Sequence, residues 1–141
     1  MMFQIAIDIN ELLYDDLPIQ TFADRLKKAK AIKGISQKEL ADSTGISRSC
    51  INELEAGYRD NISICTLNKL ISVLDKNILC DDYLNFVLNQ QQYINEAIDK
   101  KGITNLCKYI KSHHSTVYRW RDNKNKIPYN KYILLKEMDQ D

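Results

Sequence analysis

The sequence predicts an all-α protein in which two small helical units follow one another, with a short strand or arm at the N-terminus. Between Ser36 and Gly57, apolar residues recur at helical spacing, and capping residues and glycines bound them. The apolar positions of this stretch coincide, at one constant offset, with those of a second stretch near the C-terminus. The chain has 141 residues, which is enough for one ordinary domain or for two small helical ones.

Residues 1–19 form a leader in which apolar residues alternate with other residues at the period of a strand. The apolar positions are Phe3, Ile5, Ile7 and Ile9. Because a lone strand is not stable in water, two arrangements are open. The strand pairs with the same strand of a second chain and makes a homodimer, or the leader folds over its own domain as an arm or extra helix. In the second arrangement, Leu12, Leu13 and Leu17 join the core.

After Pro18, the sequence predicts a helix that begins at Phe22, with Thr21 as its N-cap. A further helix is expected from Ser63, in the stretch SICTLNKLISVLD. The residues that share one face of the first of these helices are Phe22, Leu26, Ala29 and Ile32.

Two short helices joined by a tight turn are predicted between these elements. Ser36 and Glu39 form a capping box at the start of the first helix. Gly45 occupies a turn position that favours positive φ, and Ser47 caps the second helix, which Gly57 ends. The residues expected to face inward are Leu40, Ala41, Ile46, Ile51 and Leu54.

With these elements, residues 20–80 resemble the phage-repressor-like helix-turn-helix regulators of bacteria, the XRE or Cro/C1 type. The resemblance implies a lambda-repressor-like fold that binds double-stranded DNA. Arginine, asparagine and glutamate on the outer face of the second helix suit guanine, adenine and cytosine edges. The residues expected to contact bases are Arg48, Ser49, Asn52 and Glu53. The resemblance assigns phosphate contacts to Gln37, Ser47, Tyr58 and Arg59.

Residues 81–141 begin with a helix capped by Asp81 or Asp82, and Gln90–Gln92 marks a connector. Alternatively the helix continues to Lys101, since none of these residues breaks a helix. The residues that define the first turns of this helix are Leu84, Val87 and Leu88.

The rest of this region resembles the small Cro-type helix-turn-helix, so that two such units would stand in tandem. The inner positions repeat in the pairs Leu40 and Leu106, Ala41 and Cys107, Ile51 and Val117, Leu54 and Trp120. A basic loop, a proline and a short helix follow, and their marker residues are Trp120, Lys126, Pro128 and Tyr132 to Leu135. Lys111 stands where glycine is expected, and Ser112 where an apolar residue is expected. The turn should therefore be strained or differently built.

Two roles for this second unit are equally open. As a second DNA site, it would use the outward residues His113, His114, Ser115, Tyr118 and Arg119, with Arg121, Lys124 and Lys126 near the backbone. As a dimerisation or partner-binding module, it would hold Trp120, Tyr129 and Tyr132 in its core.

The net charge of +1 hides an uneven distribution. Residues 20–76 carry +3 and residues 100–141 carry +6, whereas residues 1–19 and 77–99 carry −4 each. Basic character therefore lies on the two segments expected to be globular, which suits phosphate contact.

Several function classes are excluded by the residues that are missing. The four cysteines form no CxxC pair, and the two adjacent histidines cannot face one metal from a helix, so no metal and no cofactor are expected. The cysteines are expected to be buried free thiols. Without an arranged base or a glycine-rich phosphate loop, enzyme activity is not expected. The chain lacks a membrane-length apolar run and a signal peptide, which predicts a cytoplasmic protein of a bacterium or a phage-infected host.

These observations predict a sequence-specific transcriptional regulator, a repressor of bacterial or phage type that acts by promoter occlusion as a homodimer. The alternative from a different class is a protein-interaction module, such as an antitoxin or a phage-encoded inhibitor. Such a module would keep the scaffold but bind a protein partner through the C-terminal domain.

Overall fold

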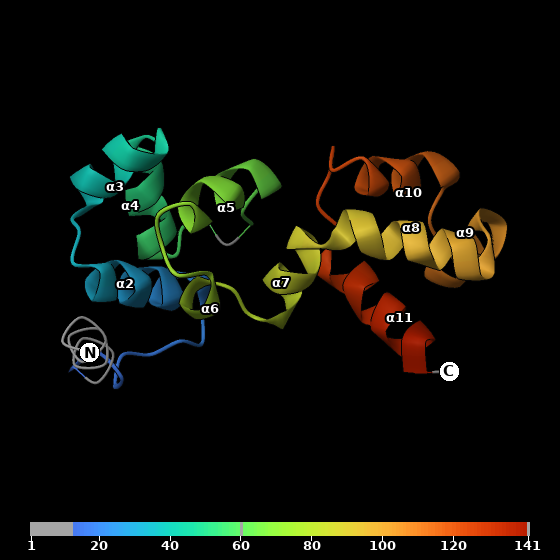
Figure 1. Cartoon of the computed structure of the whole chain (residues 1–141), viewed down its shortest axis with the longest axis horizontal. Helices are drawn as coiled ribbons and strands as arrows, with labels where there is room; N and C mark the ends of the chain where they lie inside the picture. Colours follow the sequence, from blue (N-terminus) through green and yellow to red (C-terminus); the bar gives the residue numbers. More distant parts are fainter. Residues whose placement is uncertain (1–12, 60, 141) are drawn as a thin grey trace, which may run out of the picture. The chain divides into compact units, whose positions relative to one another are not determined.

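The computed structural model describes residues 13–59 and 61–140, and within these ranges every regular element is a helix (Figure 1). The prediction of an all-α protein is confirmed. The chain divides into two compact units, Met1–Asp81 and Asp82–Asp141, and each has its own buried core.

The leader differs in part from the expectation. Its apolar alternation between residues 3 and 9 lies outside the described residues. Leu13 and Leu17 were expected to join the core if the leader folded over its own domain, but both are exposed, which corrects that expectation for these two residues. The physical reason is that the segment before the first described helix is held by polar contacts. The buried guanidinium of Arg25 donates to the carbonyl oxygens of Ile19 and Gln20 at 3.1 and 3.3 Å.

The first described helix, α2 (Phe22–Lys33), starts with a complete capping box. The Thr21 hydroxyl accepts from the backbone N–H of Asp24, and the Asp24 carboxylate accepts from the backbone N–H of Thr21. Gly34 ends the helix in the left-handed conformation. Phe22, Leu26 and Ala29 are buried as expected from their spacing, and α2 packs against α4 and α6.

Helices α3 (Gln37–Thr44) and α4 (Arg48–Ala56) pack against each other across a tight turn. Ser36 and Ser47 cap them as expected, and Gly45 adopts a φ of 77°, which a residue with a side chain reaches only with strain. The expected inner residues are placed accordingly: Ala41 is half-buried, and the fully buried ones are Leu40, Ile46, Ile51 and Leu54.

Helices α5 (Ile64–Ile71) and α6 (Lys76–Leu79) complete the first unit, with Ser63 as the N-cap of α5. Arg25 joins the beginning and end of this unit, because its Nε donates to the carbonyl oxygen of Leu79 at 3.0 Å and its guanidinium lies 3.5 Å from the Asp81 carboxylate. Residue spacing alone does not predict that this buried arginine holds the ends of the unit together.

The second unit begins with α7 (Asp82–Leu88) and α8 (Gln90–Lys101), which Asn89 interrupts. The sequence left open whether Gln90–Gln92 is a connector or whether a helix runs on to Lys101, and the structure has a helix from Gln90 to Lys101, separated from α7 only by Asn89. Gln90 is not part of a connector. Its side chain is fully buried and makes three hydrogen bonds: it donates to the carbonyl oxygens of Trp120 and Asn125 and accepts from the N–H of Ile127. A primary amide has two donors and an acceptor, so Gln90 can bond at once to the carbonyl oxygen of Trp120 in α10, which also accepts from the Asn123 N–H, and to two backbone groups of the loop after α10.

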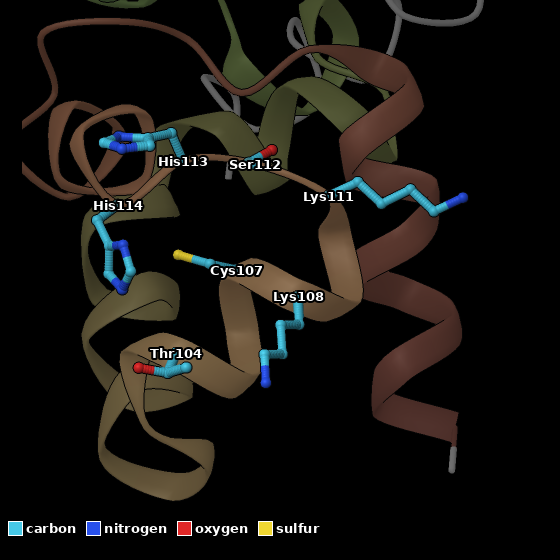
Figure 2. Close-up of a pocket in the computed structure, with 7 residues that line it drawn as sticks. All are labelled: Thr104, Cys107, Lys108, Lys111, Ser112, His113 and His114. Carbon is cyan, nitrogen blue, oxygen red and sulfur yellow. The ribbon is translucent and has the colours of Figure 1, made fainter.

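Helices α9 (Ile103–Ile110) and α10 (His114–Arg121) follow, joined by the turn that Figure 2 shows from Lys111 to His113. Lys111 adopts the left-handed conformation with φ 54°, so it takes the backbone state that glycine takes at the corresponding turn of the first unit. The side chain of Ser112, at the position where an apolar residue was expected, is half-buried and donates to the carbonyl oxygen of Ile110.

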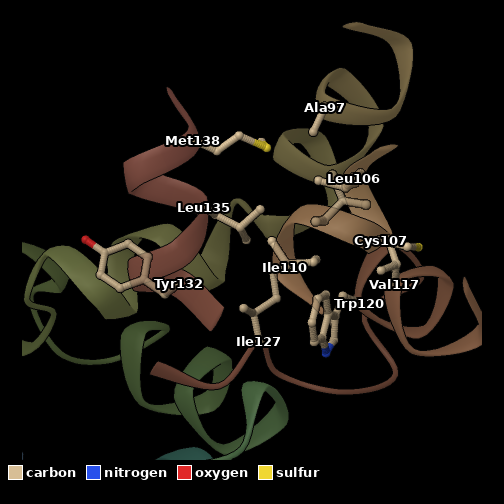
Figure 3. Packing of buried hydrophobic residues seen from close by; sticks show 11 residues of the cluster. Ala97, Leu106, Cys107, Ile110, Val117, Trp120, Ile127, Tyr132, Leu135 and Met138 are labelled. Atoms are coloured by element: carbon tan, nitrogen blue, oxygen red, sulfur yellow. The ribbon is translucent and has the colours of Figure 1, made fainter. Parts of the chain in front are cut away.

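Helix α11 (Tyr129–Gln140) ends the second unit and packs against α9, while α8 packs against α9 and α10. Figure 3 shows the core that these helices enclose. Trp120 and Tyr132 are 2 and 5 % exposed, so they are core residues, whereas Tyr129 is 60 % exposed, contrary to its expected place in the core. The other members are Ile94, Ala97, Leu106, Cys107, Ile110, Val117, Ile127, Leu135 and Met138.

The expectation of buried thiols holds for two of the four cysteines. Cys80 and Cys107 are buried, but Cys50 is half-buried and Cys65 is exposed on the outer face of α5. Cys65 points outward because the buried positions of α5 are Leu67 and Leu70, which lie on the opposite face. Among the described residues, no helix has the length and apolar character needed to cross a membrane.

Candidate nucleic-acid interface

The outer face of α4 carries the side chains that were expected to contact bases. Ile51 and Leu54 are buried against the rest of the unit, so the helical period turns the intervening positions outward. Arg48, Ser49 and Asn52 are exposed, and Glu53 is half-buried. The expected set therefore lies on one accessible helix face.

A shallow hollow lies where the N-terminal end of α3 meets this face. Its lining residues are Gln37, Arg48, Ser49 and Asn52. Three of these were expected to contact bases, and Gln37 was expected to contact a phosphate. The structure thus brings four expected residues from two helices to one place.

A buried ion pair lies behind this hollow. Glu55 is 7 % exposed, and one of its carboxylate oxygens pairs with the ammonium of Lys30 on α2. The other carboxylate oxygen accepts from Nε2 of Gln37 at 2.5 Å. Nε2 of Gln37 also donates to Oδ1 of Asn52 at 3.5 Å. The Lys30–Glu55 pair is therefore connected, through the amide of Gln37, to Asn52, which was expected to contact a base.

The other end of α4 is built differently. Glu53 pairs with Arg59 beyond the helix, and a guanidinium N–H of Arg59 also points at the Cys50 sulfur at 3.9 Å. The side chain of Tyr58 is exposed, while its backbone N–H donates to the carbonyl oxygen of Glu53. Arg59, expected to bind phosphate, is therefore already engaged with Glu53, which was expected to contact a base.

Ser47 lies at the N-terminal end of α4 and is exposed. Its hydroxyl accepts from the backbone N–H of Cys50, so its acceptor capacity serves the helix cap. The hydroxyl hydrogen is still available to donate to an external acceptor.

Comparison with known protein families matches residues 26–79 to the helix-turn-helix family. Residues 26–79 are a helix-turn-helix domain. The matched range holds α3, the turn and α4, together with most of α2 and the whole of α5 and α6. The phage-repressor-like resemblance of this part of the chain is confirmed, and the domain is of a DNA-binding kind. The match ends at residue 79 and does not extend to the second unit. Comparisons with curated proteins and with solved structures gave no match.

Sequence reasoning missed Lys30 and Glu55 of the helix-turn-helix domain. A signal for Glu55 was present, because it lies four residues after Ile51 and one after Leu54, on the buried side of α4. A carboxylate at such a position requires a partner. Residue spacing could not identify Lys30 as that partner, because Lys30 lies on α2, an earlier helix.

In the second unit, the expected DNA-contacting residues fall into two groups. His114, Ser115, Arg119 and Lys124 are exposed. His113 instead caps α10, because its Nδ1 accepts from the backbone N–H of Ser115 at 3.1 Å. Nδ1 also lies 2.9 Å from the Ser115 hydroxyl, so Nε2 is the ring nitrogen left for an external partner.

Arg121 and Lys126, the other basic residues expected to lie near the DNA backbone, contact groups within the unit. The Arg121 guanidinium lies 4.6 Å from the ring centroid of Tyr118 and bonds the Asp122 carboxylate. Lys126 lies 5.8 Å from the ring centroid of Tyr83, and burial lowers the pKa of its ammonium. The Asp122 carboxylate partly compensates the charge of Arg121, and Lys126 is half-buried beside a ring, so both side chains are already engaged within the unit.

Another hollow of the second unit lies between α9 and the turn before α10 (Figure 2). The buried thiol of Cys107 lines it, and burial raises the pKa of that thiol. The other lining residues are Thr104, Lys108, Lys111, Ser112, His113 and His114. Across the described residues, no group of histidine, cysteine and acidic side chains has the arrangement to hold a metal ion.

Proposed function

We propose that the protein is a sequence-specific DNA-binding regulator that represses transcription by occluding a promoter. Helix α4 of the helix-turn-helix domain lies in the major groove in this proposal, and the exposed Arg48, Ser49 and Asn52 contact base edges. Glu53 contacts a base from its place beside Arg59. As a regulator of bacterial or phage type, the protein would act in the cytoplasm, where its DNA lies.

The observation that supports this proposal most directly is the outer face of α4 within a helix-turn-helix domain. Arg48 is exposed at the first position of that helix, where the N-terminus of a recognition helix approaches the bases. Ser47, Tyr58 and the backbone N–H groups at the start of α3 flank this face, in positions suited to phosphate contacts.

Arg48→Ala should remove discrimination at one base pair, at a cost of about 1–3 kcal/mol on the preferred sequence and little on others. The experiment is selection of bound sequences from random duplex DNA, followed by titrations on the selected site and on single-base variants. Lys69→Ala is the matched control, because Lys69 is exposed on α5 outside the proposed interface. An equal loss on every sequence would show that Arg48 contacts a phosphate rather than a base.

A homodimer is the second part of the proposal. Two copies of the domain bound to one face of the duplex would read half-sites about 34 Å apart, so the selected sequence should be close to palindromic. A single half-site in the selected sequences and in footprints would indicate a monomeric regulator.

The second unit is proposed as a further DNA-contacting element. The observation in its favour is that His114, Ser115 and Arg119 are exposed on α10, at the positions that correspond to the outer face of α4. Selection with the full chain should then yield a longer motif than selection with the N-terminal unit. An unchanged motif would favour the alternative in which the second unit binds a protein partner.

A further inference from the structure

We propose that the buried Lys30–Glu55 pair sets the hydrogen-bonding direction of Asn52, so that α4 presents this residue to DNA as a donor. The inference rests on the proposed function, because it assumes that Asn52 faces a base. It goes beyond that function by assigning a specificity-determining role to Glu55, which does not face the DNA, and to Gln37 as its intermediary.

The first step concerns the charge state of the buried group. Glu55 is 7 % exposed and pairs with Lys30, whose side chain is 19 % exposed. A carboxylate in an ion pair has only acceptors, since it carries no hydrogen. Whatever side chain meets its second oxygen must therefore donate.

The second step concerns Gln37, the side chain that meets this oxygen. Its amide could in principle turn either its oxygen or its nitrogen toward Glu55. An amide oxygen against the carboxylate would place two acceptors in contact, so the nitrogen must face Glu55, as it does at 2.5 Å. The second hydrogen of the same nitrogen is directed to Asn52.

The third step concerns the orientation of the Asn52 amide. Since Gln37 donates, Asn52 must turn its Oδ1 toward Gln37, and the two atoms lie 3.5 Å apart. The Nδ2 of Asn52 is then left with two hydrogens on an exposed side chain that lines the hollow beside Arg48. The hydrogen bonds between Glu55, Gln37 and Asn52 are therefore all satisfied in one orientation of the two amides, and the negative charge of Glu55 determines which one.

The chemical consequence is a preference for bases that present an acceptor at the position Asn52 faces. In the major groove, guanine N7 and O6 and thymine O4 are acceptors, the cytosine N4 group is a donor, and adenine combines an N7 acceptor with an N6 donor. Adenine N7 can accept one hydrogen of Nδ2, but without an outward Oδ1 Asn52 cannot also accept from N6, so the two-bond contact with adenine is lost. We therefore expect a keto base, guanine or thymine, opposite Asn52. Gln37 uses both amide hydrogens inside the protein, so it offers only an acceptor outward and does not bind a phosphate in this arrangement.

The decisive variant is Glu55→Gln, which keeps the size of the side chain but gives it a donor. The new amide can keep its oxygen on Lys30 and turn its nitrogen to Gln37. Gln37 then presents its oxygen to both neighbours, and Asn52 turns its Oδ1 outward. The keto preference at that one position should fall at least tenfold or be replaced by a preference for adenine or cytosine.

The experiment is selection from random duplex DNA with the full chain, in the wild type and in four variants. Asn52→Ala identifies the base position that Asn52 faces. Gln37→Met interrupts the series while leaving the Lys30–Glu55 pair intact, so it should also remove the keto preference even if Glu55→Gln fails to fold. Asp42→Asn, on the exposed side of α3, removes a negative charge without touching the series and should leave the preference unchanged.

Two results would overturn the inference while leaving the proposed function standing. One is a wild-type preference for adenine or cytosine at the position that Asn52→Ala identifies. The other is a keto preference that persists in folded Gln37→Met. If the wild type enriches no sequence at all, the proposed function fails, and the inference fails with it.

Discussion

At the scale of single residues, the pair formed by Glu53 and Arg59 changes what a substitution there should do. Arg59 alone would be read as a phosphate contact, whose loss weakens binding to all sequences and flattens the salt dependence. Because it pairs with Glu53, its removal also leaves a carboxylate uncompensated beside the DNA. The pair is too exposed to contribute much to folding, about 0.5 kcal/mol at most after solvent screening.

We predict that Arg59→Ala weakens DNA binding more when Glu53 is present than in the background of Glu53→Gln. Titrations of both single variants and the double variant across a range of salt concentrations measure this coupling. If Arg59→Ala costs the same factor in both backgrounds, Arg59 acts on phosphate independently of Glu53.

Lys111 adopts a left-handed backbone conformation, which is unfavourable for a residue with a long side chain. Its φ of 54° costs a residue with a Cβ roughly 1 kcal/mol, which glycine does not incur. We predict that Lys111→Gly raises the free energy of unfolding of the second unit by about 0.5–1 kcal/mol. Lys108→Gly, within α9 on an exposed position, should instead lower it by about 1 kcal/mol. Urea unfolding of both variants checks the opposite signs, and a loss of stability in both would contradict the role of φ.

The thiols should react in an order that follows their burial. Burial raises the pKa of the Cys80 and Cys107 thiols, so less thiolate is present at any given pH, and both are sterically covered. Cys65 is exposed. We predict that alkylation near pH 8 labels Cys65 first and that Cys107 and Cys80 lag by at least an order of magnitude. Peptide mass spectrometry over time measures the order, and early labelling of Cys107 would show that the hollow in Figure 2 admits the reagent to a reactive thiol.

At the scale of elements, Gln90 holds the loop after α10 to α8. This loop carries Lys124 and joins α10 to the proline before α11. We predict that Gln90→Leu lowers the free energy of unfolding of the second unit by about 2–4 kcal/mol, because the Ile127 N–H and the Asn125 carbonyl oxygen lose the side chain that pairs with them, and the Trp120 carbonyl oxygen loses one of its donors.

The control for this substitution is Gln92→Leu on the same helix. Gln92 is exposed and bonds only Glu96 on the helix surface, so its loss should change stability by no more than about 0.5 kcal/mol. Chemical unfolding followed by the fluorescence of Trp120 reports on this unit, since Trp120 is the only tryptophan in the chain. Equal stability of the two variants would mean that water replaces the lost bonds.

At the scale of the whole molecule, the two units have separate cores. We predict that residues 1–81, produced alone, keep a helical circular dichroism spectrum and select the same central DNA motif as the full chain. Selection by both forms from random duplexes measures this. An unfolded fragment would show that the second unit is needed for the stability of the first. A folded fragment without sequence preference would show that recognition of a DNA sequence requires both units.

The local elements of the first unit could be predicted well from sequence because their signals act over a few residues. Thr21, Ser36, Ser47 and Ser63 cap their helices by bonds to N–H groups three residues away, and these are visible in the residue order. The outward set on α4 followed from the same short-range period. Burial of Gln90 could not be predicted in this way, since its partners lie 30 to 37 residues further along the chain.

The sequence by itself determined the all-helical class, the N-terminal ends of α2 to α5, the helix-turn-helix motif of the first unit and the face of α4 that meets solvent. Each of these depends on interactions between residues within one or two helical turns. The tertiary structure alone decided that Glu53 pairs with Arg59, that Lys30 and Glu55 stand behind Gln37 and Asn52, and that Gln90 belongs to a core. Those outcomes require distant segments to meet, and the hydrogen-bonding partner of a buried polar group is set by the element packed against it rather than by its neighbours in the chain.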